Sequence, residues 1–184
     1  MKSKPDKIIL DLCAGTGAWS EPYLQAGYDV HRIDIETGQD VRLLGLPQTV
    51  YGILIAPPCT NLAVSGARWW ASKGDGALLE ALSIVDACLR IVLITQPNFW
   101  ALENPVGRLT RFIGKPVLWF HPSDYGDFWH KKTGIWGRFN IPQMNPVLPL
   151  EKDRIHKMAP SVNRGKQRAV TPPGFAQAFF EANR

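Results

Sequence analysis

The pattern that most constrains the fold lies near the start of the chain. An apolar run, Lys7-Ile8-Ile9-Leu10-Asp11-Leu12, is followed by a glycine turn, Cys13-Ala14-Gly15-Thr16-Gly17. Residues from about 19 to 26 then show helical spacing, and a second apolar run over 29–34 ends in Asp34. Strand, glycine turn, helix and acidic-ended strand make a βαβ unit, which binds its ligand at the carboxyl ends of the strands.

The rest of the chain continues this alternation. Apolar runs at 50–56 and 99–103 predict two more buried strands, and apolar residues spaced by three and four over 76–95 predict a long amphipathic helix. Beyond Pro105 we expect strands at 117–120 and 134–139, loops to about residue 170, and a terminal helix with Thr171 as N-cap. The predicted fold class is α/β: a Rossmann-like, largely parallel sheet with helices on both faces and a loop-rich C-terminal part.

Length and composition favour a single domain. The chain has 184 residues, of which 45% are hydrophobic and 20% charged, so we expect one domain over 1–184. Within it, 1–105 would hold the ligand-binding core and 106–184 a basic, loop-rich, substrate-facing part. No apolar stretch approaches the roughly 20 residues of a membrane span. Three scattered cysteines and four histidines without ligand spacing argue against disulfides and a metal site. We expect a cytoplasmic protein with no membrane partner.

Charge is divided unevenly along the chain. Through Asn104 there are eight Lys/Arg and eleven Asp/Glu, a net charge of −3, whereas the residues from Pro105 onward have thirteen and five, a net charge of +8. A basic segment of this kind favours a polyanionic partner, although an ordinary solvated surface has the same composition.

The glycine turn carries the first chemical signal. Gly15 and Gly17 let the backbone approach a ligand closely, and the helix behind them can hold an anionic group at its amino terminus. Asp34 is suited to accept hydrogen bonds from both hydroxyls of a ribose. The dinucleotide fingerprint is incomplete, because Ser20 stands where its third glycine belongs. A turn needed only for tight packing remains an alternative.

Two further acidic positions indicate which nucleotide-like ligand fits. Asp11, directly before the turn, is suited to meet an amino group or, through water, a cation. S-adenosylmethionine offers an ammonium, a ribose and an adenine, and Asp40 with Val41 can supply the contact to the adenine amine. S-adenosylmethionine is therefore the expected cofactor.

Cys59 is the second signal. It follows Pro57 and Pro58 at the exit of a predicted strand, where catalytic groups of open α/β sheets are found, and a thiolate there is an effective nucleophile. The segment from 60 to 76, which includes Ser65 and Arg68, is rich in small and polar residues and predicts a loop that closes over a substrate. A small buried hydrophobe is the commoner fate of a free cysteine.

Glu103-Asn104 is the third signal. Glu103 ends the apolar run Phe99-Trp100-Ala101-Leu102, and apolar surroundings raise the pKa of a carboxyl group and favour a protonated donor. A solvated glutamate at the end of a strand is the alternative. Asn104 with Pro105 would fix the local turn and hold the neighbouring loop.

Together these motifs resemble, in order and spacing, the DNA cytosine-5 methyltransferases. The matching elements are Asp11-Leu12-Cys13-Ala14-Gly15-Thr16-Gly17, Asp34, Pro58-Cys59 and Glu103-Asn104. The resemblance covers about residues 8–105. It implies cofactor binding by the first motif, Trp19, Asp34-Ile35, Asp40-Val41 and Pro57, and methylation of a cytosine that has left the base stack. Cys59 would attack carbon 6, Glu103 would act on ring nitrogen 3, and Asn104 would position the Cys59 loop.

Later segments resemble the same family less closely. His130-Lys131-Lys132-Thr133 stands where the family has an arginine-containing motif, so Lys131 or Lys132 would contact the cytosine or a phosphate, as Pro58, Ser65 and Arg68 are expected to contact substrate. Arg168-Ala169-Val170-Thr171-Pro172 is similar to the Arg-x-x-Thr-Pro segment, in which the arginine organises structure.

The departures from the family concern the choice of target. Thr60 replaces the usual glutamine after the cysteine, and the chain between Arg138 and Arg168 is too short for a large target-recognition region. The protein would then read little DNA sequence, rely on a specificity or recruitment partner, or act on single strands. Such compact forms resemble phage or prophage proteins, which implies a role in genome modification or evasion of restriction.

Two alternatives remain at this point. One is a catalytically inactive or partner-dependent module that binds cofactor or DNA. The other is an amino-group methyltransferase, since Ala56-Pro57-Pro58-Cys59 echoes the Asp/Asn-Pro-Pro-aromatic motif of that class. That chemistry requires an amide or carboxylate at position 56 and an aromatic residue at position 59, and neither is present.

Overall fold

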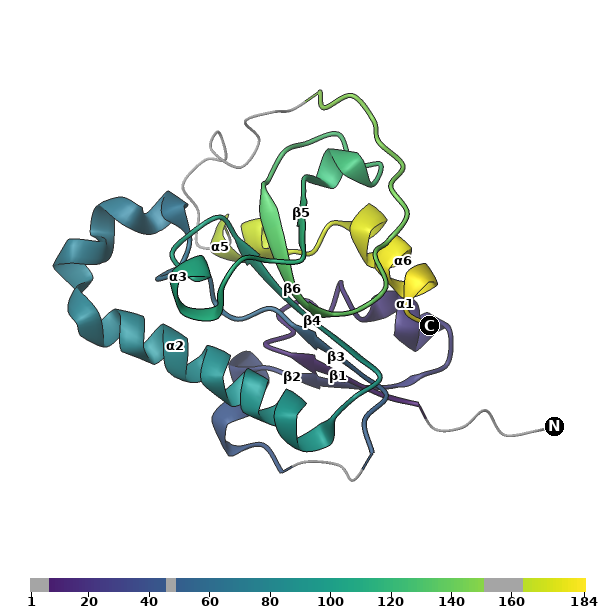
Figure 1. Cartoon of the computed structure of the whole chain (residues 1–184), viewed down its shortest axis with the longest axis horizontal. Helices are drawn as coiled ribbons and strands as arrows, with labels where there is room; N and C mark the ends of the chain where they lie inside the picture. The colour runs from purple at the N-terminus through teal and green to yellow at the C-terminus, as the bar shows by residue number, and fades with distance from the viewer. Residues whose placement is uncertain (1–6, 46–48, 151–163) are drawn as a thin grey trace.

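A twisted sheet organises the molecule (Figure 1). The computed structural model describes residues 7–45, 49–150 and 164–184, and within these ranges six strands pair in the order β2-β1-β3-β4-β6-β5. The parallel part consists of β1 (Ile8–Leu12), β2 (Asp29–Ile33), β3 (Gly52–Ile55) and β4 (Phe99–Pro105). The chain runs from β1 to β2 on one side and returns to β3 on the other, so β1 and β3 flank a topological switch point, where open α/β sheets bind their ligands.

An antiparallel pair extends the sheet. β6 (Thr133–Arg138) pairs with β4, and β5 (Leu118–Phe120) pairs with β6. This pairing carries β4 beyond the predicted end at Glu103, because Asn104 lies opposite Gly134 and Pro105 opposite Thr133. The dipeptide Glu103-Asn104 is therefore inside a strand and is held in the sheet ladder.

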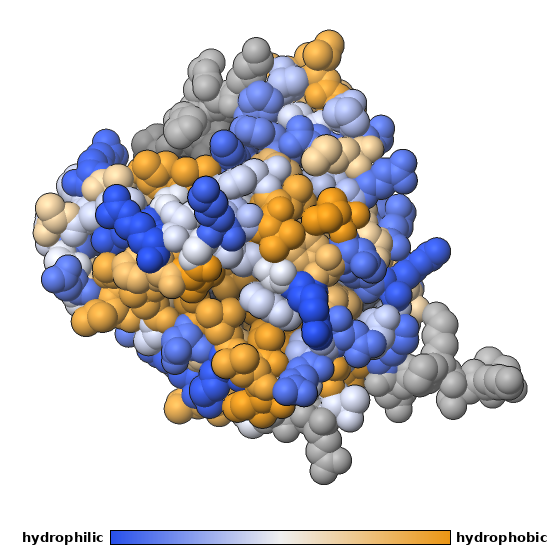
Figure 2. Space-filling view, in the orientation of Figure 1, coloured by the Kyte–Doolittle hydropathy of each residue, from blue (hydrophilic) through white to orange (hydrophobic). Residues whose placement is uncertain are grey.

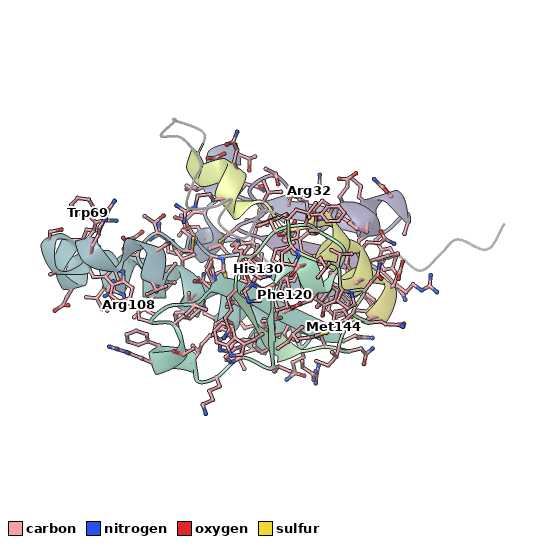
Figure 3. All side chains as sticks on the ribbon, turned by 90° about the horizontal axis from the view of Figure 1, so that it is seen from above. Arg32, Trp69, Arg108, Phe120, His130 and Met144 are labelled. Atoms are coloured by element: carbon pink, nitrogen blue, oxygen red, sulfur yellow. The ribbon has the colours of Figure 1, made fainter. Side chains whose placement is uncertain are left out.

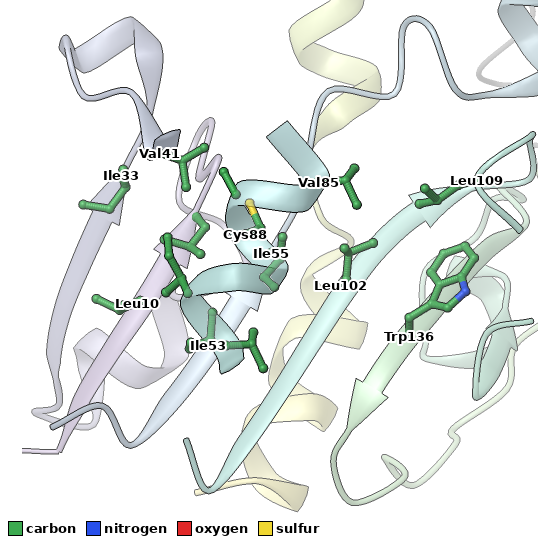
Figure 4. Close-up of a cluster of buried hydrophobic side chains, with 14 of the residues drawn as sticks. Leu10, Ile33, Val41, Ile53, Ile55, Val85, Cys88, Leu102, Leu109 and Trp136 are labelled. Atoms are coloured by element: carbon green, nitrogen blue, oxygen red, sulfur yellow. The ribbon is translucent and has the colours of Figure 1, made fainter. Parts of the chain in front are cut away.

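One face of the sheet is covered by the long helix α2 (Trp70–Thr95). Its Val85 and Cys88 pack among Leu10, Ile53 and Leu102 of the strands (Figure 4). Beyond this contact the helix leaves Leu79, Leu93 and Ile94 exposed, and Figure 2 shows hydrophobic side chains gathered where α2 lies in Figure 1.

An aromatic layer covers the opposite face. It is built by α1 (Glu21–Gln25) and α6 (Pro173–Ala182), with Tyr23 edge-on to Phe180 at 4.9 Å between ring centroids and Phe175 stacked on Phe120 at 4.1 Å. Both faces are buried, which explains why the central strands read as continuous apolar runs. The predicted α/β, Rossmann-like sheet with helices on both faces is confirmed.

Short helices complete the described residues. They are α3 (Thr110–Ile113), α5 (Arg164–Ala169) and the 3₁₀ turns η1 (Ile35–Thr37), η2 (Val41–Leu43), η3 (Val64–Trp69) and η4 (Pro122–Asp124). No helix within the described ranges is both long and apolar enough to cross a membrane.

Three local predictions need correction. The segment 60–76 is mostly helical, as η3 followed by the start of α2, with a break at Gly74 (φ 68°, ψ −176°). Thr171 is not the N-cap of α6, because Pro172 occupies that position and makes no side-chain cap bond. The part predicted to be loops contains α5, while residues 151–163 lie outside the described ranges.

Candidate active site

A cavity of about 640 Å³ opens at the carboxyl ends of β1 to β4. This volume suits a ligand of cofactor size. Its wall contains the turn after β1, the segment after β2, the Pro57-Pro58-Cys59 exit of β3, Glu103 of β4, and residues of the Gly165–Thr171 stretch. Segments far apart in the sequence therefore meet at the switch point.

The glycine turn has an unusual backbone. Cys13 has φ 59°, in the left-handed region that non-glycine residues rarely adopt, and Gly15 and Gly17 follow with φ 53° and 71°. A Cβ at Gly17 would collide with the side chain of Arg32, which donates hydrogen bonds to the Gly17 carbonyl (3.0 Å) and to Glu21 (2.6 Å). Gly17 does not line the cavity, but its close contact with Arg32 fixes the turn. Gly15 lines the cavity, and a Cβ there would meet open space.

Asp34 connects the ends of β1 and β2. Its two carboxylate oxygens accept hydrogen bonds from the backbone N–H groups of Gly15 (2.8 Å) and Glu36 (2.9 Å). The carboxylate therefore holds the glycine turn in place, and Asp34, Ile35 and Glu36 all line the cavity.

Two buried polar groups on the cavity wall lack partners. Among the residues that the structure describes, Oδ2 of Asp11, which is 1% exposed, has no hydrogen-bond partner, and neither has Nε1 of Trp19, which is 2% exposed. Burial raises the pKa of Asp11 to about 6, with Ser20 and Arg32 acting in the opposite direction. A buried acceptor and a buried donor left unpaired are costly unless a ligand satisfies them.

Asp40 and Val41 line the cavity as predicted, but Asp40 is already engaged. Arg42 donates to both of its carboxylate oxygens, at 2.7 to 3.0 Å, and these hydrogen bonds lower the pKa of Asp40. Arg42 also reaches Glu80 of α2 at 2.7 Å. Arg42 thus ties η2 to α2, and the Asp40 carboxylate holds Arg42 in place.

The Cys59 turn is anchored from two sides. The buried side chain of Asn104 donates from Nδ2 to the Pro57 carbonyl (3.1 Å), while the Cys59 carbonyl accepts from the N–H groups of Leu62 and Ala63 (2.9 and 2.8 Å). Asn104 is not in the cavity wall, so its contact with the Cys59 turn is a positioning one.

Charged groups surround the thiol of Cys59. Burial, followed by the negative charge of Glu103, raises its pKa, and Lys131 and Arg168 lower it in part. The Lys131 Nζ lies 3.5 Å from Glu103 Oε1, and these two side chains are only 10% and 12% exposed. Cys59 therefore carries a proton in the free protein, and Glu103 faces an ammonium group as well as the apolar surroundings that its sequence predicts.

The remaining predicted residues divide into two groups. Cys13, Ala14, Pro57, Pro58 and Lys131 line the cavity, and Arg168 is close enough to influence Cys59. Four others do not: Leu12 is in the hydrophobic core, Ser65 and Arg68 are exposed on η3, and Lys132 lies over the Trp119 ring at 5.4 Å.

Several wall residues were not among the predicted site residues, namely Thr16, Ile33, Glu36, Gln39, Arg42, Ala56, Thr60, Glu80, Ile84, Pro105, Gly165, Ala169, Val170 and Thr171. Thr16 and Glu36 lie next to predicted site residues, so the same motifs could have predicted them. Glu80 and Ile84 come from the face of α2 that overhangs the sheet, and only the packing of that helix reveals them.

Comparisons with known proteins identify no family. No family profile matches the chain, and neither does any curated protein. A solved structure of a candidate DNA modification methyltransferase encoded within an E. coli prophage has a TM-score of 0.49 and 18% identity, over 85% of this chain and 56% of the other. The Entamoeba histolytica methyltransferase EhMeth has a TM-score of 0.49 and 14% identity, over 87% and 62%. The chain spans less than two thirds of either structure.

Proposed function

We propose that this protein methylates carbon 5 of cytosine in DNA, with S-adenosylmethionine as methyl donor and a transient covalent bond from Cys59 to the base. The observation that carries the proposal is the meeting of Cys59, Glu103 and Lys131 in the same cavity as the unpaired groups of Asp11 and Trp19. One part of the wall thus has the groups for pyrimidine chemistry and another has the groups for a zwitterionic cofactor.

The residues present fit the cofactor. The unpaired Asp11 oxygen would accept from its ammonium, and the unpaired Trp19 N–H would donate to its carboxylate. Asp34 and Glu36 would meet the ribose, and Val41 would contact the adenine. When bound, S-adenosylmethionine supplies an electrophilic methyl group on a sulfonium centre.

Proton movements follow from the charges around Cys59. The thiol proton must leave before sulfur attacks carbon 6, and ring nitrogen 3 gains a proton as carbon 5 becomes nucleophilic. Glu103 serves both needs: its carboxylate takes the thiol proton and passes it to nitrogen 3, so that no net proton is consumed. Lys131 and Arg168 stabilise the thiolate while it forms.

The later steps restore the free nucleophile. Once carbon 5 has been methylated, its remaining proton leaves to water. The electron pair of that C–H bond re-forms the ring double bond, and the carbon 6–sulfur bond breaks to return a thiolate to Cys59. Ring nitrogen 3 gives its proton back through Glu103 to this thiolate, which restores the starting thiol and leaves a neutral 5-methylcytosine. Asn104 holds the Pro57 carbonyl throughout, which keeps the thiol aligned with the base.

The test is to identify the methylated nucleoside. Cytosine-containing DNA is incubated with protein and labelled cofactor, digested to nucleosides and analysed by mass spectrometry. We expect 5-methyldeoxycytidine, none of it with Cys59→Ala, and a rate lowered by about 100-fold or more with Glu103→Gln. N4-methyldeoxycytidine or N6-methyldeoxyadenosine would support amino-group transfer instead, and cofactor binding without any product would support a binding module.

A further inference from the structure

We propose that the segment 64–73, called the arm here, clamps single-stranded DNA and that single-stranded DNA is the substrate class of this site. The inference rests on the proposed function. The arm comprises η3 and the first residues of α2, up to the break at Gly74.

The arm is placed to guide a strand into the cavity. It begins shortly after Cys59 and Thr60, which line the cavity, and it leads into α2, whose Glu80 and Ile84 line the cavity again. It projects from the body of the molecule, and Trp69 lies at its outer end (Figures 1 and 3).

The arm carries an exposed tryptophan beside an arginine, and a half-buried tryptophan covered by an arginine from outside the arm. Trp69 is 53% exposed, and the Arg68 guanidinium lies 5.0 Å from its ring centroid. The Arg108 guanidinium covers the neighbouring Trp70 at 4.4 Å and donates from Nε to the Asn61 carbonyl (2.8 Å), which braces the base of the arm. Trp69 therefore offers a rigidly mounted indole to solvent beside a cation.

The loop next to the arm is basic. It runs from 106 to 117, between β4 and β5, and contains Arg108, Arg111 and Lys115 and no Asp or Glu, whereas Asp75 and Glu80 follow the arm on α2. It contacts the arm directly, because the Val64 N–H donates to the Val106 carbonyl at 2.8 Å. A phosphate backbone thus meets complementary charge along this side.

The exposed indole of Trp69 favours single-stranded over double-stranded DNA as the ligand. Within a duplex the faces of each base are already stacked on their neighbours, whereas an unpaired base can stack on an exposed indole. A single strand also delivers its cytosine to the cavity without the cost of unpairing and unstacking. An exposed tryptophan flanked by arginine therefore fits single-stranded DNA better than duplex.

Binding is measured by fluorescence anisotropy with one labelled oligonucleotide as single-stranded DNA, as duplex and as RNA of the same sequence. We expect the single-stranded DNA to bind most tightly. Trp69→Ala should weaken that binding by about 10-fold, with Trp69→Phe retaining most of it. Arg68→Gln should lower the salt dependence by about 0.7 in the slope of log K against log salt. Leu93→Ala, at an apolar position on α2 that is exposed even more than Trp69, is the control.

The inference is overturned if duplex or RNA binds as tightly as single-stranded DNA, or if Trp69→Ala binds like the Leu93→Ala control. Thermal melting of each variant shows whether it is folded. The nucleoside assay separates the two proposals: methylation that prefers duplex leaves the proposed function standing and contradicts the inference. Tight, Trp69-dependent binding without methylation supports the arm and contradicts the proposed function.

Discussion

Burial and a neighbouring negative charge keep the thiol of Cys59, the proposed nucleophile, protonated. Burial and the Glu103 charge raise the pKa of its thiol, and Lys131 opposes them. In the proposed mechanism Glu103 passes the thiol proton to ring nitrogen 3 of a bound cytosine, so the thiolate would form only when a base is present. The same arrangement protects the thiol from unwanted reaction when the cavity holds no substrate.

Two substitutions should move the Cys59 pKa in opposite directions. Glu103→Gln removes the negative charge and should lower it, while Lys131→Met removes the positive charge and should raise it. The measurement is the pH dependence of iodoacetamide alkylation, with the Cys59 peptide quantified by mass spectrometry so that Cys13 and Cys88 do not interfere. Shifts in the same direction for both variants would contradict this electrostatic account.

Asp11 makes stability depend on pH. Its pKa is raised from 3.8 to about 6 in the folded protein, so the folded state keeps a proton that the unfolded state has lost. Stability should therefore fall as pH rises from 3.8 to about 6, by about 3 kcal/mol at most. Urea unfolding below and above this window should show the fall in the wild type and not in Asp11→Asn. An equal pH dependence in both proteins would show that Asp11 is not the cause.

At the scale of elements, the Cys59 turn depends on the close approach of two loops. Ala63 and Gly107 form a bridge between them, and a Cβ at Gly107 would collide with the Leu62 carbonyl. The fixed turn is what places Cys59 beside Glu103, so disturbing it should affect activity and stability together.

Gly107→Ala should therefore destabilise the protein by about 1–3 kcal/mol and reduce methylation. Gly76→Ala is the matched control, because its Cβ meets open space within α2 and should stabilise by about 0.5–1 kcal/mol. Denaturant unfolding and the nucleoside assay measure the two effects. A Gly107→Ala protein as stable and active as the control would show that the approach of the loops is not required.

The sequence predicted the elements that are buried on both faces and missed those that depend on distant contacts. The strands now seen as β1, β3 and β4 appear as apolar runs because helices cover the sheet on either side. The start of α2 has no apolar periodicity, since residues 71–76 are all exposed, and it includes two glycines. Its position depends on contacts such as the hydrogen bond from Lys73 to Asn61 (2.8 Å).

The same distinction holds for the site. Residues that end parallel strands, such as Asp34 and Cys59, could be placed together from the βαβ pattern alone. The pairing of Lys131 with Glu103 could not, because it requires β6 to lie antiparallel beside β4, a contact between segments far apart in the sequence. The engagement of Asp40 by Arg42, only two residues away, could not be predicted for a different reason, because the side-chain conformation of Arg42 decides it.

At the scale of the whole molecule, the cavity joins the two parts of the chain. Its wall combines Gly15 and Asp34 from the acidic first part with Lys131 and Thr171 from the basic second part. The proposed cofactor would contact both parts, and the basic second part would remain available to the proposed DNA substrate. That 1–184 behaves as one domain stays a prediction, for which this shared wall is the physical reason.

Cofactor binding should therefore stabilise the whole chain. At about 100 times its dissociation constant, S-adenosylmethionine should contribute about 2.7 kcal/mol and raise Tm by about 5–10 °C. Adenosine, which lacks the amino-acid part that Asp11 and Trp19 would bind, should raise Tm by less. The Gly17→Ala variant should show almost no rise in Tm with S-adenosylmethionine. Differential scanning fluorimetry provides the measurement. The absence of any shift with S-adenosylmethionine would contradict the cofactor assignment.

The most direct test of the central claim is to trap the bond between Cys59 and the base. DNA containing 5-fluorocytosine, single-stranded and duplex, is incubated with protein and S-adenosylmethionine, because fluorine at carbon 5 blocks the final elimination. We predict a complex that survives denaturation, is mapped to Cys59 by mass spectrometry and is absent with Cys59→Ala. The account is contradicted if no such complex forms on any substrate although the cofactor binds, or if methyl transfer persists in Cys59→Ala.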